Sequence, residues 1–199
     1  MLFEDTYKTI AENAEGVYRE KGSRFIALAF PVETEAQVKA LLAEVKKNYH
    51  DARHHCYAYI LGANKDCYKI NDDGEPSGTA GRPIYGQLRS KDVTNVLLAV
   101  VRYFGGTKLG VSGLINAYKT AAQEALDNSK IVEKVVKDDY RIAFQYAEIN
   151  KVMSLLKSND ITIISQTLDN KCIVTFRVRR SLADRYLSEL RKVGEVALV

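Results

Sequence analysis

The sequence predicts an α+β protein made of two successive domains, and three observations predict this class. Short apolar or alternating segments that are typical of strands are interspersed with stretches of helical periodicity. A nearly continuous apolar segment, Asn95–Phe104, leads through a glycine-rich loop into a helix. After the charged stretch Ile131–Lys137 the pattern of strands and helices begins again. We therefore expect an N-terminal domain over residues 1–136 and a C-terminal domain over residues 137–199.

Composition fits a globular protein and leaves several partners open. Of 199 residues, 46% are hydrophobic and 27% are charged, and the formal net charge is +4. This mild basic excess permits contact with nucleic acid without requiring it. The chain has an odd number of cysteines, no CxxC pair, no leader-like start and no apolar run long enough for a membrane span. We expect a cytoplasmic protein without a membrane role.

The expected elements of the N-terminal domain begin with a hairpin. Two strands joined at Lys21-Gly22 precede a helix whose N-cap is Thr34 and whose apolar residues recur at i, i+3, i+4 and i+7. A second pair of strands, a short helix, a strand buried on both faces and a long helix then follow. The expected bounds are Glu15–Glu20, Ser23–Phe30, a helix to Tyr49, His55–Leu61, Cys67–Asn71, a helix over Thr79–Leu88, Asn95–Phe104 and a helix over Leu114–Asn128.

The C-terminal domain is expected to contain four strands and two helices in the order β-α-β-β-α-β. This order is that of the ferredoxin-like, split β-α-β arrangement. Ser181 is the expected N-cap of its second helix. The expected bounds are Tyr140–Gln145, a helix over Glu148–Lys157, Ile161–Leu168, Cys172–Val178, a helix from Ser181 to Lys192, and Glu195–Val199.

The loop Asp72–Gly81 is the first candidate for function. Three glycines, one proline and three carboxylates within this segment indicate an exposed loop with a specified backbone. Asp72, Asp73 and Glu75 could hold a divalent ion or orient a water molecule. Alternatively, the Asp side chains accept hydrogen bonds from the turn and Ser77 or Thr79 caps the next helix. We expect the latter role for single residues and a recognition role for the loop as a whole.

The glycine loop Gly105–Gly113 is the second candidate. It joins a buried strand to a helix, and Lys108 adds a positive charge. Backbone N–H groups freed by glycine at the start of a helix attract anions, so a phosphate or a nucleic-acid backbone would suit this loop. It lacks the GxxxxGK[ST] spacing of a Walker loop. A tight strand-to-helix turn without any ligand is the alternative.

Arg102 is expected to link the two loops. A charge at the end of a buried strand needs a partner, and one of the three carboxylates of the acidic loop could supply it. A surface-facing arginine is the alternative. Tyr103, Phe104 and Tyr118 could stack on bases, although aromatic residues at such spacing are more often part of a core.

His54, His55 and Cys56 do not predict a metal centre. Successive strand residues point to opposite faces, so His54 and Cys56 share one face and only Cys67 could join them. No third group is in place to orient a thiol nucleophile. We expect no catalytic residue set, no metal and no cofactor.

With these motifs in view, the chain resembles the IMPACT/YigZ family in its bacterial two-domain form. The resemblance is carried by Ser23-Arg24-Phe25, by the segment from His54 to Tyr59, by the segment from Asp72 to Pro83, and by the segment from Val101 to Gly110. It implies an N-terminal domain like a small-subunit ribosomal protein and domain IV of elongation factor G. It also implies a C-terminal domain like the ferredoxin-like domains of that factor.

The resemblance also implies a role in regulation of translation. Eukaryotic members of the family act by protein–protein competition on the pathway that senses amino-acid starvation. The family pattern after the glycine loop runs G-x-G-G-L-x-R-A-Y, whereas this chain has Ser112 in place of a glycine and Asn116 in place of the arginine. Any contact that depends on the charge of that arginine is therefore lost here.

We expect a binding protein that acts in or near translation and contacts RNA, the ribosome or a translation-regulating protein. The expected partner-binding residues are Asp72, Asp73, Glu75, Ser77, Thr79, Arg102, Gly105, Gly106, Lys108, Gly110 and Tyr118. Arg177 and Arg179 share one strand face and are secondary basic candidates. The alternative is a phosphate- or nucleotide-handling enzyme of the small-molecule kinase or hydrolase type, since such kinases share the N-terminal fold.

Overall fold

The computed structural model describes residues 5–199 and divides into two compact units. One unit is Tyr7–Lys134, and the other combines Val135–Val199 with Asp5 and Thr6. The α+β class predicted from the sequence is confirmed. None of the helices within residues 5–199 has the length and apolar character that crossing a membrane requires.

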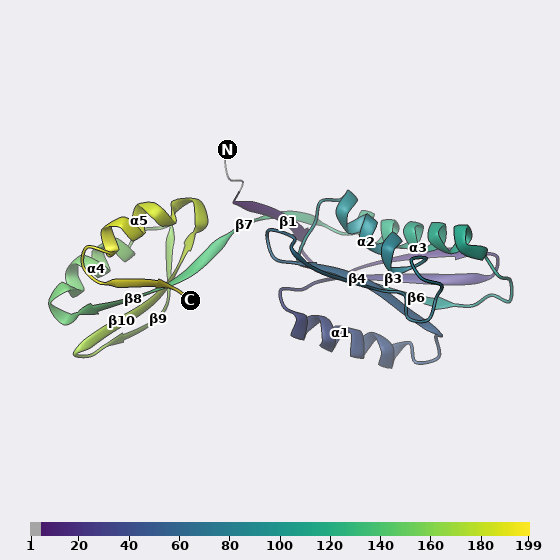
Figure 1. The fold of residues 1–199 in the computed structure, drawn as a ribbon, viewed down its shortest axis with the longest axis horizontal. Coiled ribbons are helices and arrows are strands. Elements are labelled where there is room, and N and C mark those ends of the chain that lie inside the picture. Colours follow the sequence, from purple (N-terminus) through teal and green to yellow (C-terminus); the bar gives the residue numbers. More distant parts are fainter. Residues whose placement is uncertain (1–4) are drawn as a thin grey trace. The chain divides into compact units, whose positions relative to one another are not determined.

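The Tyr7–Lys134 unit is built on a five-stranded sheet in the order β2-β3-β6-β4-β5, in which every neighbouring pair is antiparallel (Figure 1). The central strand β6 is continuously apolar from Val96 to Val101, as expected for a strand covered on both faces. The strands are β2 (Ala14–Glu20), β3 (Ser23–Pro31), β4 (His54–Leu61), β5 (Cys67–Asn71) and β6 (Val96–Tyr103).

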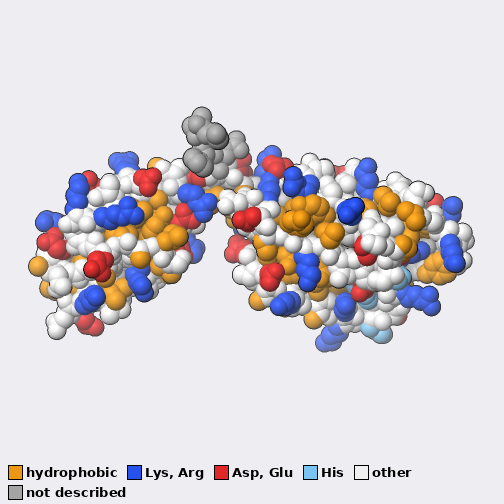
Figure 2. Space-filling model, viewed as in Figure 1, with side chains coloured by type: hydrophobic (Ala, Val, Ile, Leu, Met, Phe, Trp, Pro, Cys, Tyr) orange, Lys and Arg blue, Asp and Glu red, His pale blue; other side chains and the backbone are white. Residues whose placement is uncertain are grey.

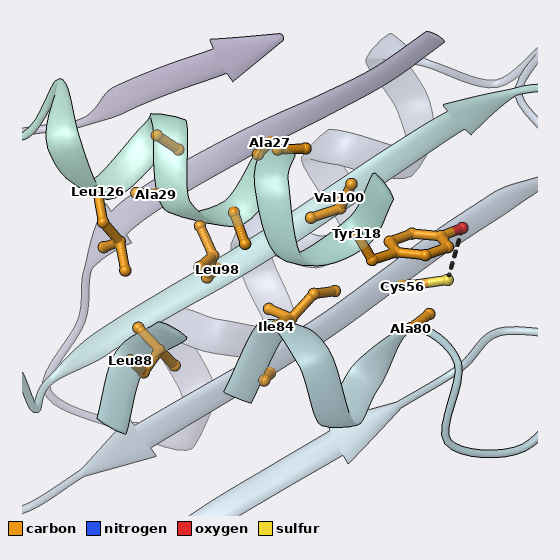
Figure 3. Close-up of a cluster of buried hydrophobic side chains, with 14 of the residues drawn as sticks. Ala27, Ala29, Cys56, Ala80, Ile84, Leu88, Leu98, Val100, Tyr118 and Leu126 are labelled. Carbon is orange, nitrogen blue, oxygen red and sulfur yellow. Dashed lines mark hydrogen bonds between the residues drawn. The ribbon is translucent and has the colours of Figure 1, made fainter. Parts of the chain in front are cut away.

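Helices cover both faces of this sheet (Figure 1). Helices α2 (Gly81–Ser90) and α3 (Gly110–Asp127) enclose the larger core on one face. Helix α1 (Glu35–Asn48) covers the other face, and its expected N-cap is confirmed because Thr34 and Gln37 form a capping box. The first core includes Ala27, Ile84, Leu98, Val100 and Leu126 (Figure 3).

Small residues let α3 lie close to the sheet. Ala117, Ala121, Ala122 and Ala125 are all buried on the face of α3 that joins the core. A Cβ atom at Gly16 of β2 would lie 2.3 Å from the backbone nitrogen of Ala125. Glycine is therefore required there by the space between strand and helix.

Two strands in this unit were missed by the sequence analysis. Strands β1 (Thr6–Ile10) and β7 (Ile131–Val135) pair with each other in a two-stranded sheet. We expected no element over the charged stretch Ile131–Lys137. Only one residue of β7 is even half-buried, so the strand lacks the apolar alternation by which strands are recognised.

Two helix starts also differ from expectation. Helix α3 begins at Gly110, four residues before the expected Leu114, so the last part of the glycine loop is helical. Helix α2 begins at Gly81 with Ala80 as its N-cap, and no side chain caps it. Neither Ser77 nor Thr79 is therefore a cap, and the Thr79 hydroxyl instead donates to the Pro76 carbonyl at 2.6 Å.

The second unit has the expected β-α-β-β-α-β order. Its antiparallel sheet runs β11-β8-β10-β9, and the helices contribute Val152, Leu156, Leu187 and Leu190 to one core. The elements are β8 (Lys137–Gln145), the short helix η1 (Tyr146–Glu148), α4 (Ile149–Leu156), β9 (Ile161–Leu168), β10 (Lys171–Arg179), the short helix η2 (Arg180–Leu182), α5 (Ala183–Leu190) and β11 (Glu195–Leu198).

Asp5 and Thr6 group with this second unit, whereas the division at residue 136 expected from the sequence would place them in the N-terminal domain. The Asp5 carboxylate accepts two hydrogen bonds from Arg179, each 2.7 Å long. It also accepts one from the backbone N–H of Ser181 at 3.1 Å. The expected capping role of Ser181 is wrong, because α5 begins two residues later with Leu182 as its N-cap.

Candidate functional site

The acidic loop and the segment after β6 meet at one pocket in the Tyr7–Lys134 unit. The pocket has a volume of about 500 Å³. Its charged and polar lining comes from Arg53, His54, Glu75, Arg102 and Lys108. Its apolar lining comes from Pro76, Phe104, Leu109, Val111 and Leu114. A hollow of this size with an apolar wall and few polar groups has the character of a ligand site.

Asp72 organises the acidic loop from within. Its carboxylate accepts hydrogen bonds from the backbone N–H groups of Gly78, Ala80 and Gly81 at 2.8–3.0 Å. Burial acts to raise the pKa of this carboxyl, and the three N–H donors outweigh burial, so the pKa is lowered. Asp72 thus fixes the shape of the loop and does not line the pocket.

Glu75 and Arg102 form a buried ion pair at the base of the pocket. The guanidinium Nη1 of Arg102 donates to Oε1 of Glu75 at 2.6 Å, and both side chains are less than a tenth exposed. The guanidinium also lies 5.5 Å from the ring centre of Phe25 and 5.6 Å from that of Phe104. The link expected between Arg102 and the acidic loop exists, and Glu75 is the partner.

Tyr118 is a second hydrogen-bond donor to Glu75. Its hydroxyl donates to Oε1 of Glu75 at 2.8 Å, and the thiol of Cys56 lies 3.4 Å from the same hydroxyl (Figure 3). Burial raises the pKa of Tyr118, with further contributions from Cys56 and Glu75, so the phenol stays neutral. Tyr118 is fully buried, which corrects its expected role as a partner contact: it supports the ion pair instead.

Asp73 and the two histidines join the acidic loop to β4. Nδ1 of His54 lies 2.8 Å from the Asp73 carbonyl, and the backbone N–H of His55 donates to the Asp73 carboxylate at 2.7 Å. Because a carbonyl only accepts, Nδ1 of His54 carries the hydrogen. Nε2 of His54 then faces Oε1 of Glu75 at 4.0 Å.

The glycine segment brings β6 past the β2–β3 turn and into α3. A Cβ atom at Gly105 would lie 1.9 Å from the carbonyl carbon of Gly22, so two backbones touch here. The N–H of Gly105 donates to the Ser23 hydroxyl at 3.1 Å and is not free for an anion. Gly110 has φ +73°, a conformation that favours glycine, and α3 begins there without a side-chain cap.

The structure thus divides the residues proposed from the sequence into groups. Glu75, Arg102, Lys108 and Gly110 line the pocket. Asp72, Asp73, Thr79 and Tyr118 hold the surrounding structure together by hydrogen bonds. Ser77, Gly105 and Gly106 do not line the pocket.

Sequence reasoning missed part of the pocket. Arg53 was not proposed. Leu109 and Val111 lie within the proposed glycine loop Gly105–Gly113, but neither they nor Leu114 was expected to form an apolar wall. The sequence analysis weighed His54 for a metal centre and for a thiol nucleophile and expected neither, so it did not place this histidine in a pocket. Arg53 immediately precedes the strand whose residues reach the acidic loop, and this adjacency was the available signal.

The two arginines proposed in the C-terminal unit are both engaged with carboxylates. Arg177 makes two hydrogen bonds to Asp139, at 2.6 and 2.8 Å. Arg179 pairs with Asp5. Their expected common face is consistent with the register of β10, but their charge is balanced within the unit.

The face of the molecule in Figure 2 shows basic and acidic side chains intermingled. The pale blue histidine side chains in view lie on the lower right part of the Tyr7–Lys134 unit, with Lys and Arg side chains near them (Figure 2). Within residues 5–199 neither Arg53 nor Lys108 forms an ion pair.

Fold and site together define a two-domain α+β protein with a cationic pocket that has a largely apolar wall on its larger domain. Residues 21–126 match the model of the Impact N-terminal domain. The chain belongs to the IMPACT family.

Similar proteins agree with this assignment over most of the chain. The chain is 35% identical to the IMPACT family member YvyE of Bacillus subtilis, covering 79% of this chain and 73% of that one. It is 36% identical to the IMPACT family member YigZ of Escherichia coli, covering 79% and 78%. A solved structure described as that of a hypothetical protein matches with TM-score 0.80 and 28% identity, over 99% of this chain and 98% of that one.

Proposed function

We propose that this protein is a translation-associated regulatory binding protein and that its pocket contacts RNA. The observation that carries the proposal is the meeting of Arg53, Arg102 and Lys108 around one hollow that also has an apolar wall. Phosphate groups account for most of the affinity in nucleic-acid binding, and exposed aromatic and apolar groups suit bases.

The charge balance at the pocket supports an anionic partner. The charge of Arg102 is compensated by Glu75, whereas Arg53 and Lys108 are exposed and remain uncompensated among the described residues. The pocket therefore carries an excess of two positive charges at its rim. The phosphate-handling enzyme considered from the sequence would need free carboxylates. The carboxylates of Asp72, Asp73 and Glu75 are instead engaged by backbone N–H groups or by Arg102, which disfavours this alternative.

Fluorescence anisotropy with a short labelled single-stranded RNA tests the proposal. If two phosphates are neutralised, the logarithm of the binding constant should fall against log salt with a slope of about −1.4. A variant with Arg53→Ala and Lys108→Ala should bind more weakly and have a slope near zero. The matched control is Lys39→Ala, which removes an exposed charge from α1 on the other face of the sheet.

Two results would contradict the proposal. One is binding that does not respond to salt or to the double substitution. The other is a partner that stays bound to the protein after nuclease treatment of a lysate and is released by the double substitution, which would assign the pocket to a protein partner.

A further inference from the structure

The pocket has a shape suited to a single ring system. A protein that binds the backbone of a duplex does so with charged groups spread along its surface. This site is instead a pocket of about 500 Å³, within the range of small-molecule pockets. Its wall is largely apolar, which a phosphate alone would not need. The hollow therefore fits a part of the ligand that is flat, apolar on its faces and unpaired.

Phe104 provides an aromatic surface in this hollow. The residue is 48% exposed although it lines the pocket, and its ring centre lies 5.6 Å from the guanidinium carbon of Arg102. Exposing half of a large aromatic side chain forgoes the stabilisation that burial would give it. Bases of single-stranded nucleic acids stack on such rings irrespective of sequence.

Two hydrogen-bond acceptors lie together in the same wall. Oε1 of Glu75 accepts hydrogen bonds from Arg102 and Tyr118. Oε2 accepts none from residues 5–199, and it is not completely buried, so it can still accept one. In the tautomer with the hydrogen on Nδ1, Nε2 of His54, 4.0 Å from Oε1 of Glu75, is a second acceptor. Paired acceptors suit the N–H₂ group of a base and disfavour the carbonyl oxygens of uracil.

The rim supplies a site for the phosphate of the same nucleotide. Leu109, Gly110 and Val111 line the pocket at the uncapped start of α3, an eighteen-residue helix, and Lys108 lies beside them. Free N–H groups at a helix start and an adjacent ammonium group both favour an anion. The apolar wall, the acceptors and the cationic rim therefore belong to one pocket.

We infer that the pocket takes one unpaired nucleotide of a single-stranded RNA, with its base on Phe104, an amino group of the base on Glu75 and His54, and its phosphate between Lys108 and the start of α3. This inference rests on the proposed function and specifies its ligand. It assigns the selectivity for unpaired RNA to the apolar wall and the selectivity for amino-bearing bases to the two acceptors.

The test compares oligo(A), oligo(C) and oligo(U) with a duplex RNA of equal length, by anisotropy at one salt concentration. We expect oligo(A) and oligo(C) to bind about tenfold more tightly than oligo(U) or the duplex. Phe104→Leu keeps the apolar volume and should weaken binding of oligo(A) about tenfold without changing the duplex. Tyr146→Leu, at an exposed tyrosine of the other unit, is the matched control and should change neither.

The outcomes separate this inference from the function on which it rests. Absence of salt-dependent RNA binding would overturn both. Salt-dependent binding that is equal for all the RNAs and insensitive to Phe104→Leu would overturn the inference and leave the proposed function standing. Displacement of oligo(A) by an equal concentration of free adenosine monophosphate would overturn the assignment to a strand. The comparison of bases needs no variant, so it holds even if Phe104→Leu fails to fold.

Discussion

The buried ion pair of Glu75 and Arg102 holds the base of the pocket in one conformation. Two charges less than a tenth exposed have lost most of their hydration, and their mutual hydrogen bond offsets that loss. The Arg102 Nε atom is buried without a partner, so Glu75 is the group that compensates this guanidinium. Removing either member leaves the other as an isolated buried charge.

Glu75→Gln should therefore destabilise the Tyr7–Lys134 unit by about 3–5 kcal/mol. The free energy of unfolding, measured by urea denaturation, checks this value. The double variant Glu75→Gln/Arg102→Met removes both charges and should recover a large part of the loss. A cost below about 1 kcal/mol for the single variant, the range of exposed pairs, would contradict the burial argument.

The three cysteines should differ sharply in their reactivity. Burial raises the pKa of Cys56 to about 12, so at pH 8 only about one thiol in 10⁴ is ionised. Cys172 is also buried, whereas Cys67 is exposed on β5. A thiol reagent should modify one residue of the folded protein quickly and all three after unfolding. Mass spectrometry should find the label on Cys67, and Cys67→Ser should abolish the fast phase.

At the scale of elements, the short distance between α3 and the sheet determines which residues strand β2 can carry where the two meet. Gly16→Ala would place a methyl group 2.3 Å from the backbone of α3, and backbone cannot move aside as a flexible side chain can. We expect a loss of about 1–3 kcal/mol in the free energy of unfolding. Gly86→Ala in α2 is the control: nothing lies within 4 Å of the added methyl group, and alanine should stabilise the helix by up to about 1 kcal/mol. Equal effects of the two substitutions would contradict this account.

Elements with strong periodicity were predictable from the sequence, and weakly patterned ones were not. β9 has the bounds that were predicted, and β6 was recognised from its apolar run. β7 was missed because four of its five residues are exposed, and a strand that is exposed at most positions need not alternate apolar and polar residues. The start of α3 was placed too late because Gly110 and Gly113 weaken a helix locally, while the tertiary structure holds them in one.

The candidate site was predictable as a pair of loops and not as a pocket. A charge on a buried strand predicted that Arg102 needed an acidic partner. The choice among Asp72, Asp73 and Glu75 depended on the folding of the loop backbone, in which Asp72 binds N–H groups of the loop itself. Leu109 and Val111 lay within the proposed glycine loop, but because the start of α3 was misplaced, the sequence did not show that Leu109, Val111 and Leu114 line one wall of a pocket.

For the whole molecule, acidic pH should act strongly on the second unit. Hydrogen bonds from Arg179 hold the pKa of Asp5 far below its ordinary value, and Arg177 lowers that of Asp139. A lowered pKa in the folded state means that the ionised carboxylates stabilise the fold. This contribution is complete above the unfolded value of 3.8 and is lost as the pH falls below it towards the folded pKa.

Hydrogen exchange of Val135–Val199 should accordingly show constant protection from about pH 7 to pH 5, after correction for the intrinsic rate, and a fall below about pH 4. Asp5→Asn should lower protection of this unit at neutral pH and flatten its response to acid. Glu12→Gln, at an exposed residue of the other unit, is the control. An unchanged acid response in Asp5→Asn would contradict the role given to this carboxylate.

The grouping of Asp5 with Val135–Val199 has a practical consequence for dissecting the protein. A fragment made by one cut after Lys134 would retain Arg179 and Ser181 but lack the carboxylate that binds both. Measurements of stability on that fragment would therefore describe a unit that lacks these hydrogen bonds. To study this unit alone with those hydrogen bonds intact, the segment that carries Asp5 must be supplied again, either as an added peptide or fused to the other end of the fragment.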